Sequence, residues 1–221
     1  MNSNNPPPAN ETRQKEISRR AKVLQASRSS PSNGPHRITQ AAWFIADANV
    51  LIDYISTDPD VLSLAAKHLG PIHVETAVLQ EVEQLSADYC KKVGLTPVQA
   101  NLEQLSEASV RSGSLSFQDN LCLILARDRG WSCLSNDGPL RKVCQKNGIK
   151  VVWGLELMFG LIQHGCLSIE RSIEVAYAIH AINPVYITRN IVEQFQQKIR
   201  SLAGVQHHQG SEDATKSGEL Q

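Results

Sequence analysis

Short apolar stretches alternate with segments of helical periodicity along most of this chain. The first stretch, residues 43–46, ends at Asp47, and apolar residues at helical spacing follow from position 50. The other strand candidates are residues 72–74, 131–135 and 149–153. Strands that alternate with helices form parallel sheets that helices cover on both faces. The alternation therefore predicts an α/β fold, a three-layer α/β/α sandwich around a central parallel sheet.

The helix candidates carry start and stop signals. Asn49 and Thr76 are expected to cap two helices, and Ser116 with Asp119 has the S-x-x-[DE] spacing of a capping box. Further helices are predicted at residues 97–109, 140–145, 155–163, 168–181 and 188–199. The last three are extra C-terminal helices, and we expect them to dock on the same domain because their apolar stripes must be buried.

Composition separates a central domain from two tails. Residues 1–40 hold seven basic and two acidic residues, a net charge of +5 in a chain whose total is zero. They are also rich in Pro, Ser and Asn and poor in large apolar residues, so we interpret them as a disordered basic tail. The predicted domain runs from 42 to 203, with its core at 43–157, and residues 204–221 form a second disordered tail.

Cysteine usage and hydropathy bear on location. The five cysteines are scattered, with no C-x-x-C pair, which indicates reduced thiols that mostly fill the core. We find no apolar run of about 18 residues and no signal-peptide h-region. We therefore expect a soluble, cytoplasmic protein with no membrane partner.

Four acidic residues are candidates for chemistry. Ligands of open parallel sheets bind beyond the carboxyl ends of the strands. Asp47 and Asp137 each end a strand candidate, Asp119 lies in the first turn of a helix, and Glu81 lies on the flank of another helix. Taken singly, Asp119 also fits a helix cap, Asp137 a turn and Glu81 a solvated helix face. Together the four carboxylates would repel one another, and a divalent metal is the usual compensation.

Four segments, in order, resemble a PIN-domain protein. They are Ile45-Ala46-Asp47-Ala48-Asn49-Val50-Leu51-Ile52, Ala77-Val78-Leu79-Gln80-Glu81-Val82, Leu115-Ser116-Phe117-Gln118-Asp119-Asn120, and Ser135-Asn136-Asp137-Gly138-Pro139-Leu140-Arg141 with Gly148-Ile149-Lys150-Val151-Val152. The resemblance covers about residues 44–157. It implies an α/β/α sandwich and a metal-dependent ribonuclease, many members of the family being VapC-like toxins of toxin–antitoxin modules.

The resemblance also implies roles for particular residues. The catalytic acids would be Asp47, Glu81, Asp119 and Asp137, with Glu83 as the alternative to Glu81. Of these, Asp47, Asp119 and Asp137 would hold Mg²⁺ or Mn²⁺, and Asn49 would support Asp47. Asn136 stands where the family often has an acidic or small polar residue, so a single ion is expected.

Substrate and partners are less defined by the sequence. Arg141 and Lys142 fit contacts to backbone phosphate and equally fit a solvated helix face. The partners expected are the RNA substrate and an antitoxin or a second copy of the chain. A catalytically inactive PIN-like module that binds protein or RNA is the alternative. A dinucleotide enzyme is excluded because Asp47-Ala48-Asn49-Val50 stands where G-x-G-x-x-G would be required.

Overall fold

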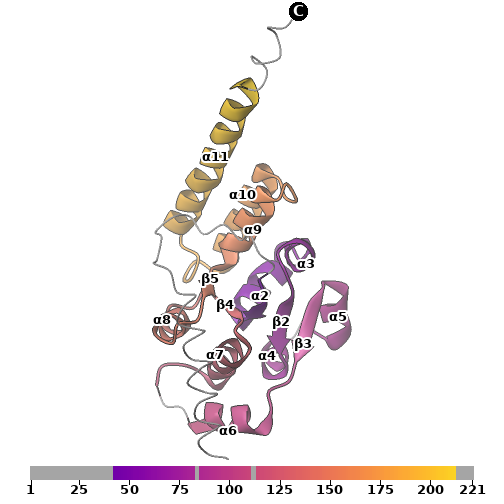
Figure 1. Ribbon diagram of the computed structural model, residues 1–221, viewed down its shortest axis with the longest axis vertical. Coiled ribbons are helices and arrows are strands. Elements are labelled where there is room, and N and C mark those ends of the chain that lie inside the picture. The colour runs from indigo at the N-terminus through magenta and orange to yellow at the C-terminus, as the bar shows by residue number, and fades with distance from the viewer. Residues whose placement is uncertain (1–41, 83–84, 111–112, 213–221) are drawn as a thin grey trace, which may run out of the picture. The chain divides into compact units, whose positions relative to one another are not determined.

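A parallel sheet lies at the centre of the structure (Figure 1). The computed structural model describes residues 42–82, 85–110 and 113–212, without the side chains of Glu81 and of residues 203–212. Within these residues the sheet has five strands in the order β3-β2-β1-β4-β5. The strands are β1 (Phe44–Ala46), β2 (Ile72–Glu75), β3 (Leu95–Val98), β4 (Ser132–Leu134) and β5 (Val151–Val152). All their pairings are parallel, which confirms the predicted sheet.

The register aligns the starts of the central strands. Phe44 of β1 pairs with Ile72 of β2 on one side and with Ser132 of β4 on the other. The carboxyl ends of β1, β2 and β4 therefore share one edge of the sheet. Chain order runs away from β1 through β2 to β3, then returns to β4 and β5. This reversal makes the gap between the ends of β1 and β4 the topological switch point, where ligands of open α/β sheets bind.

Helices cover both faces of the sheet. They are α2 (Ala48–Ile55), α3 (Asp60–His68), α4 (Thr76–Glu81), α5 (Ala87–Lys92), α6 (Leu102–Val110), α7 (Phe117–Arg129), α8 (Gly138–Lys146), α9 (Gly154–Gln163), α10 (Ile169–Ile182) and α11 (Arg189–Glu212). Right-handed crossovers place the helices that follow β1 and β2 on one face and those between β3 and β5 on the other. Contacts of α3 with α9 and of α2 with α10, against those of α7 with α6 and α8, show these two layers (Figure 1). The three-layer sandwich is confirmed.

The C-terminal helices dock on this domain, as predicted. Helix α11 packs on α10 and α9, and its side chains Val192, Phe195 and Ile199 are buried in the main core. The helix continues past Ala203, where the sequence placed the end of the domain. Residues 1–41 and 213–221 lie outside the described residues, so the two predicted tails and the domain boundaries stay predictions.

The five cysteines are free thiols, as predicted. Four of them are buried and Cys166 is half-buried. The helices of the described part of the chain were also compared with the length and hydropathy that a membrane crossing requires, and none of them reaches both.

Three local predictions were wrong. Pro97 was expected to begin a helix but lies in β3, where Val74 of β2 pairs with it; a proline without an N–H group is tolerated on such an edge strand. The helix starts instead at Leu102. Two caps are also shifted by one or two residues, because Glu75 occupies the N-cap of α4 in place of Thr76, and Asp47 occupies that of α2 in place of Asn49.

Helix α4 ends earlier than the helical spacing of Val78, Leu79, Val82 and Leu85 suggests. Its last residue is Glu81, and Val82 has an extended backbone with φ −101° and ψ 92°. Val82 and Leu85 are nevertheless buried in the main core. Their apolar character thus reports burial and not helical structure.

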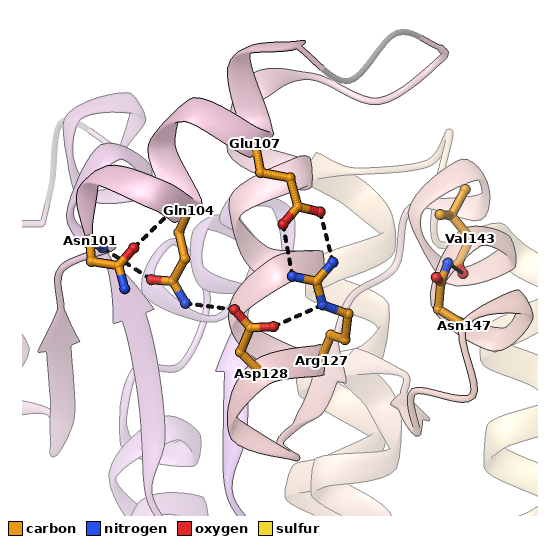
Figure 2. Close-up of polar contacts among 7 residues, drawn as sticks. All are labelled: Asn101, Gln104, Glu107, Arg127, Asp128, Val143 and Asn147. Atoms are coloured by element: carbon orange, nitrogen blue, oxygen red, sulfur yellow. Dashed lines mark hydrogen bonds and ion pairs between the residues drawn. The ribbon is translucent and has the colours of Figure 1, made fainter. Parts of the chain in front are cut away.

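A polar cluster joins α6 to α7 (Figure 2). Arg127 forms two hydrogen bonds with the Glu107 carboxylate, at 2.7 and 2.8 Å, and its Nε donates to Asp128 at 2.8 Å. The amide of Gln104 donates to the other Asp128 oxygen at 2.9 Å. Asn101 completes the N-terminus of α6 by accepting from the Gln104 backbone N–H. The cluster fixes α6 on α7. Its charged residues, Glu107, Arg127 and Asp128, pair with one another.

Candidate functional site

The switch point of the sheet is lined by polar residues. Asp47 follows β1 directly, and Ser135, Asn136 and Asp137 follow β4. The backbone N–H of Asp47 donates to Leu134 O at 3.0 Å, which extends the pairing of the two strands up to this edge. The structure therefore brings two of the predicted acids to one place because the strands that carry them are neighbours.

Asp47 is the most buried of these acids, with a 4 % exposed side chain. Its Oδ2 accepts from the Ser135 hydroxyl at 2.8 Å and from the Asn49 amide at 3.5 Å. It occupies the N-cap position of α2, yet no side-chain capping bond is formed there. Asn49 contacts Asp47 as the sequence predicted, although from within α2. Because it forms no such bond, the Asp47 side chain does not cap the N-terminus of α2.

Burial raises the pKa of Asp47 to about 6, because desolvation disfavours its charged form. The hydrogen bond from Ser135 lowers the pKa, and the charges of Asp119 and Asp137 raise it. The three carboxylates are thus close enough to interact electrostatically. A protein does not ordinarily gather like charges at a buried position, and such perturbed groups concentrate at functional sites.

Asp119 and Asp137 have structural roles as well. Asp119 forms a full capping box with Ser116: its Oδ2 accepts from Ser116 N at 2.9 Å, and its own N–H donates to Ser116 Oγ at 3.0 Å. Asp137 is the N-cap of α8, and its Oδ1 accepts from Leu140 N at 2.7 Å. Each bond uses one oxygen of the carboxylate, and a carboxylate has two.

Glu81 is placed only in part. It is the last residue of α4, which starts at the end of β2, and its side chain lies outside the described residues. Glu83, the alternative, lies wholly outside them. Their predicted roles stay predictions.

The structure adds an acid that the sequence analysis missed. Glu75 ends β2 and is 1 % exposed. Its carboxylate accepts from the backbone N–H of Ala77, from the Thr76 hydroxyl at 3.0 Å and from Ala100 N at 3.4 Å. Burial raises the pKa of the Cys122 thiol, and the charges of Asp47, Asp119 and Glu75 raise it further, so these three carboxylates interact electrostatically with the same thiol. The signal was its position, since Glu75 follows a β-branched stretch as Asp47 follows the first strand.

A third buried carboxylate, Asp53, supports the loop after β4. Asp53 of α2 is 1 % exposed and accepts from the amides of Asn136 at 2.9 Å and Asn183 at 2.8 Å. Asn136 in turn accepts from Gly154 N at 2.9 Å. A Cβ atom on Gly154 would lie 2.9 Å from the Asn136 amide, so any larger residue there would force this amide to shift. This network links the loop after β4 to α2, to α9 and to the end of α10.

The two predicted substrate contacts differ. The Arg141 guanidinium lies over the Trp153 ring, 3.5 Å from its centroid, and its Nε donates to Asp137 O at 3.2 Å. Burial lowers the pKa of Arg141, although Asp137 and Glu156 favour its charged form. Lys142 is exposed. Arg141 is therefore held beside the acidic edge, whereas Lys142 reaches into solvent.

The donors at this edge determine whether a metal ion fits there. Among the described side chains, no three of His, Cys, Asp and Glu lie close enough together to hold an ion as they stand. The reason is visible in Asp119 and Asp137, which both turn toward helix caps. The donor chemistry nevertheless fits Mg²⁺ or Mn²⁺, which prefer carboxylate oxygens, and an ion would relieve the repulsion that Asp47 experiences. The donor types therefore suit Mg²⁺ or Mn²⁺, although the described side chains do not form a complete coordination site.

Comparison with known proteins gives little beyond this. No protein-family model matches the chain, and no curated protein matches its sequence. Among solved structures, a PilT N-terminus (PIN) domain protein from the hyperthermophilic archaeon Sulfolobus solfataricus is similar, with a TM-score of 0.40 and 9% sequence identity. The match covers 52% of this chain and 89% of that chain. A similarity of this extent says nothing about activity, which must rest on the residues of this chain.

Proposed function

We propose that the chain is a metal-dependent endoribonuclease that hydrolyses RNA phosphodiester bonds at the carboxyl edge of its sheet. One observation carries the proposal: the buried Asp47 has its pKa raised to about 6 beside Asp119 and Asp137, at the topological switch point. The position is the usual ligand site of open α/β sheets, and the charge cluster is one that a divalent cation would stabilise.

The proposed roles follow from the donors. Asp47, Asp119 and Asp137 would hold a single Mg²⁺ or Mn²⁺, which when bound would polarise the phosphate and lower the pKa of the attacking water. Ser135 and Asn49 keep Asp47 oriented by donating to its Oδ2. Asn136, in the richest versions of such a site an acid, is neutral and its amide is directed to Asp53. Glu81 would orient the attacking water, and Glu83 is its alternative.

Arg141 and Lys142 are the proposed contacts to the RNA backbone. Arg141 supports this assignment best because Trp153 and Asp137 O hold its guanidinium beside the acidic edge. The resemblance to VapC-like proteins extends the proposal to a cytoplasmic toxin whose partner is an antitoxin or a second copy of the chain.

Cleavage of labelled RNA tests the proposal. The purified full-length protein would be incubated with single-stranded and structured RNA in Mg²⁺, in Mn²⁺ and in EDTA, next to the double variant Asp47→Asn/Asp119→Asn. We expect metal-dependent cleavage that the double variant loses. Cleavage that persists in EDTA or in the double variant would contradict the assigned site.

Metal binding tests the role of Asp119 separately from activity. Asp119→Asn retains an oxygen that can accept from Ser116 N, so the capping box should survive. We expect Mn²⁺ affinity measured by calorimetry to fall at least about tenfold, as seen for lost metal-site interactions, with an unchanged far-ultraviolet circular dichroism spectrum. Unchanged affinity in a folded variant would leave Asp119 a helix cap only.

The alternative function is a PIN-like module that binds protein or RNA without catalysis. The capping bonds of Asp119 and Asp137 favour it, because each acid already has a structural role at a helix end. This reading predicts neither Mn²⁺ binding nor cleavage by the wild-type protein. Mn²⁺ binding that depends on Asp47 and Asp119 would exclude it.

A further inference from the structure

Three aromatic rings stack at the edge of the sheet opposite the acids. Trp43 directly precedes β1, Trp131 precedes β4, and His73 lies in β2. The His73 ring centroid lies 3.9 Å from that of Trp131 and 5.3 Å from that of Trp43, with interplanar angles of 17° and 11°. The pairing of Phe44 with Ser132 produces this arrangement, since it sets the residues before the two strands side by side.

The three rings differ in exposure. His73 and Trp131 are 7 % and 8 % exposed, whereas Trp43 is 50 % exposed. His73 Nδ1 donates to Phe44 O at 3.2 Å, which fixes the orientation of the ring. Burial lowers the pKa of His73, so its ring is neutral at neutral pH. Core packing thus accounts for two of the rings but leaves one half of the Trp43 indole facing solvent.

A cation flanks the stack. Arg129, exposed at the C-terminal end of α7, has its guanidinium 5.6 Å from the centroid of the Trp131 ring. A ligand matched to these features has a flat aromatic part and negative charge, and nucleotides combine both.

We propose that Trp43, backed by His73 and Trp131 and flanked by Arg129, is a stacking site for a base of single-stranded RNA. Trp43 would stack on the base and Arg129 would contact the neighbouring phosphate. The choice of RNA as the ligand rests on the proposed function. Trp43 and Asp47 lie at opposite edges of the sheet, four residue steps of an extended strand apart, roughly 13 Å.

Binding without cleavage tests this site. A fluorescein-labelled single-stranded RNA of about 20 nucleotides, longer than the footprint of a typical single-strand binding fold, would be titrated with the full-length protein in EDTA, and its anisotropy measured. The variants are Trp43→Ala, Trp43→Phe and Arg129→Gln. Tyr186→Ala and Arg189→Gln remove a partly exposed aromatic ring and an exposed charge from elsewhere in the fold and serve as matched controls.

Loss of one stacked base should raise the Kd of Trp43→Ala roughly 5- to 150-fold. Trp43→Phe should lose less, because a phenyl ring still stacks. Arg129→Gln should weaken binding and lower its salt dependence. Both controls should bind as the wild type does. An unchanged Kd for a folded Trp43→Ala protein, shown by circular dichroism, would overturn the stacking site.

Further outcomes separate this inference from the proposed nuclease. In the Asp47→Asn/Asp119→Asn background, Trp43→Ala should weaken RNA binding in EDTA as it does in the wild type. Binding that depends on Trp43 in a protein that never cleaves would keep the stacking site and remove the nuclease. Cleavage without any effect of Trp43→Ala on binding would do the reverse.

If Trp43→Ala does not fold, quenching of tryptophan fluorescence by RNA decides, since it should be weaker in Trp43→Phe. The proposal would be overturned if RNA did not quench the tryptophan fluorescence of the wild type. It would also be overturned if Trp43→Ala abolished self-association of the protein and left RNA binding unchanged.

Discussion

A single carboxylate, Asp47, carries the strongest functional signal in this chain. It lies between two strand ends, it has no capping bond, and its charged form is disfavoured by burial and by two neighbouring acids. Asp119 and Asp137 are equally good candidates in the sequence, yet the side chains of both cap helices. Burial therefore distinguishes Asp47 from its neighbours more clearly than residue type does.

The raised pKa of Asp47 makes stability depend on pH. Between its ordinary value of 3.8 and about 6, the folded protein binds a proton that the unfolded chain has lost, so the free energy of unfolding falls as pH rises through this window. Asp47→Asn mimics the neutral acid. We expect it to stabilise the protein on the order of 1 to 3 kcal/mol at pH 7 and hardly at all near pH 4, measured by thermal unfolding at both pH values.

The matched control for this prediction is Asp88→Asn, an exposed acid in α5. Its effect on the melting temperature should be small at both pH values, since surface substitutions of this kind change stability little. A stabilisation by Asp47→Asn that is equal at pH 4 and pH 7 would contradict the assigned burial of its charge. At pH 7, added Mn²⁺ should raise the melting temperature of the wild type and not that of the variant.

At the scale of elements, Asp53 holds three parts of the fold together. It joins α2 to the loop after β4 through Asn136 and to the end of α10 through Asn183. Burial raises its pKa to about 6, and the two amide donors act against this rise. The acidic edge therefore rests on a buried polar network, in which each donor needs its acceptor.

Asp53→Ala tests this network. The substitution leaves the buried Asn136 amide and the half-buried Asn183 amide without their acceptor. A buried donor left without an acceptor costs roughly 1–3 kcal/mol. We expect the free energy of unfolding to fall by at least about 2 kcal/mol in urea denaturation at neutral pH. Asp60→Ala, an exposed acid of α3, is the control and should change it by less than about 0.5 kcal/mol. A loss no larger than that of the control would show that the network contributes no stability.

At the scale of the whole molecule, the C-terminal helices belong to the domain. Residues 1–40 are expected not to belong to it. Val192 and Ile199 of α11 are fully buried in the main core, whereas residues 1–40 have few apolar side chains to bury. The asymmetry is one of hydrophobic burial, which dominates the stability of a domain.

Two truncations test this difference. Deletion of residues 1–40 should leave the melting temperature nearly unchanged, because the sequence provides no core from that segment. Deletion from residue 189 onward should lower it strongly or prevent folding, since it removes buried side chains of α11 and exposes the surface beneath them. A drop of many degrees on removing residues 1–40 would show instead that the segment packs on the domain.

The sequence by itself determined the layer architecture and the acids of one edge. Apolar stretches that alternate with helical periodicity leave few folds other than a covered parallel sheet, and Asp47 and Asp137 follow two such stretches. These features are local, and a parallel sheet places the carboxyl ends of all its strands at one edge. Local patterns were therefore enough.

Tertiary structure alone decided the rest, because it depends on residues far apart in the chain. Pro97 lies in a strand since β2 pairs with it, and α4 ends at Glu81 although the apolar pattern continues. Asp53 shows nothing unusual in the sequence until Asn183 is placed 2.8 Å away. The stack on Trp43 likewise exists only because parallel register aligns two strand starts. Pairing and convergence of distant segments have no local periodicity, so no short stretch of sequence encodes them.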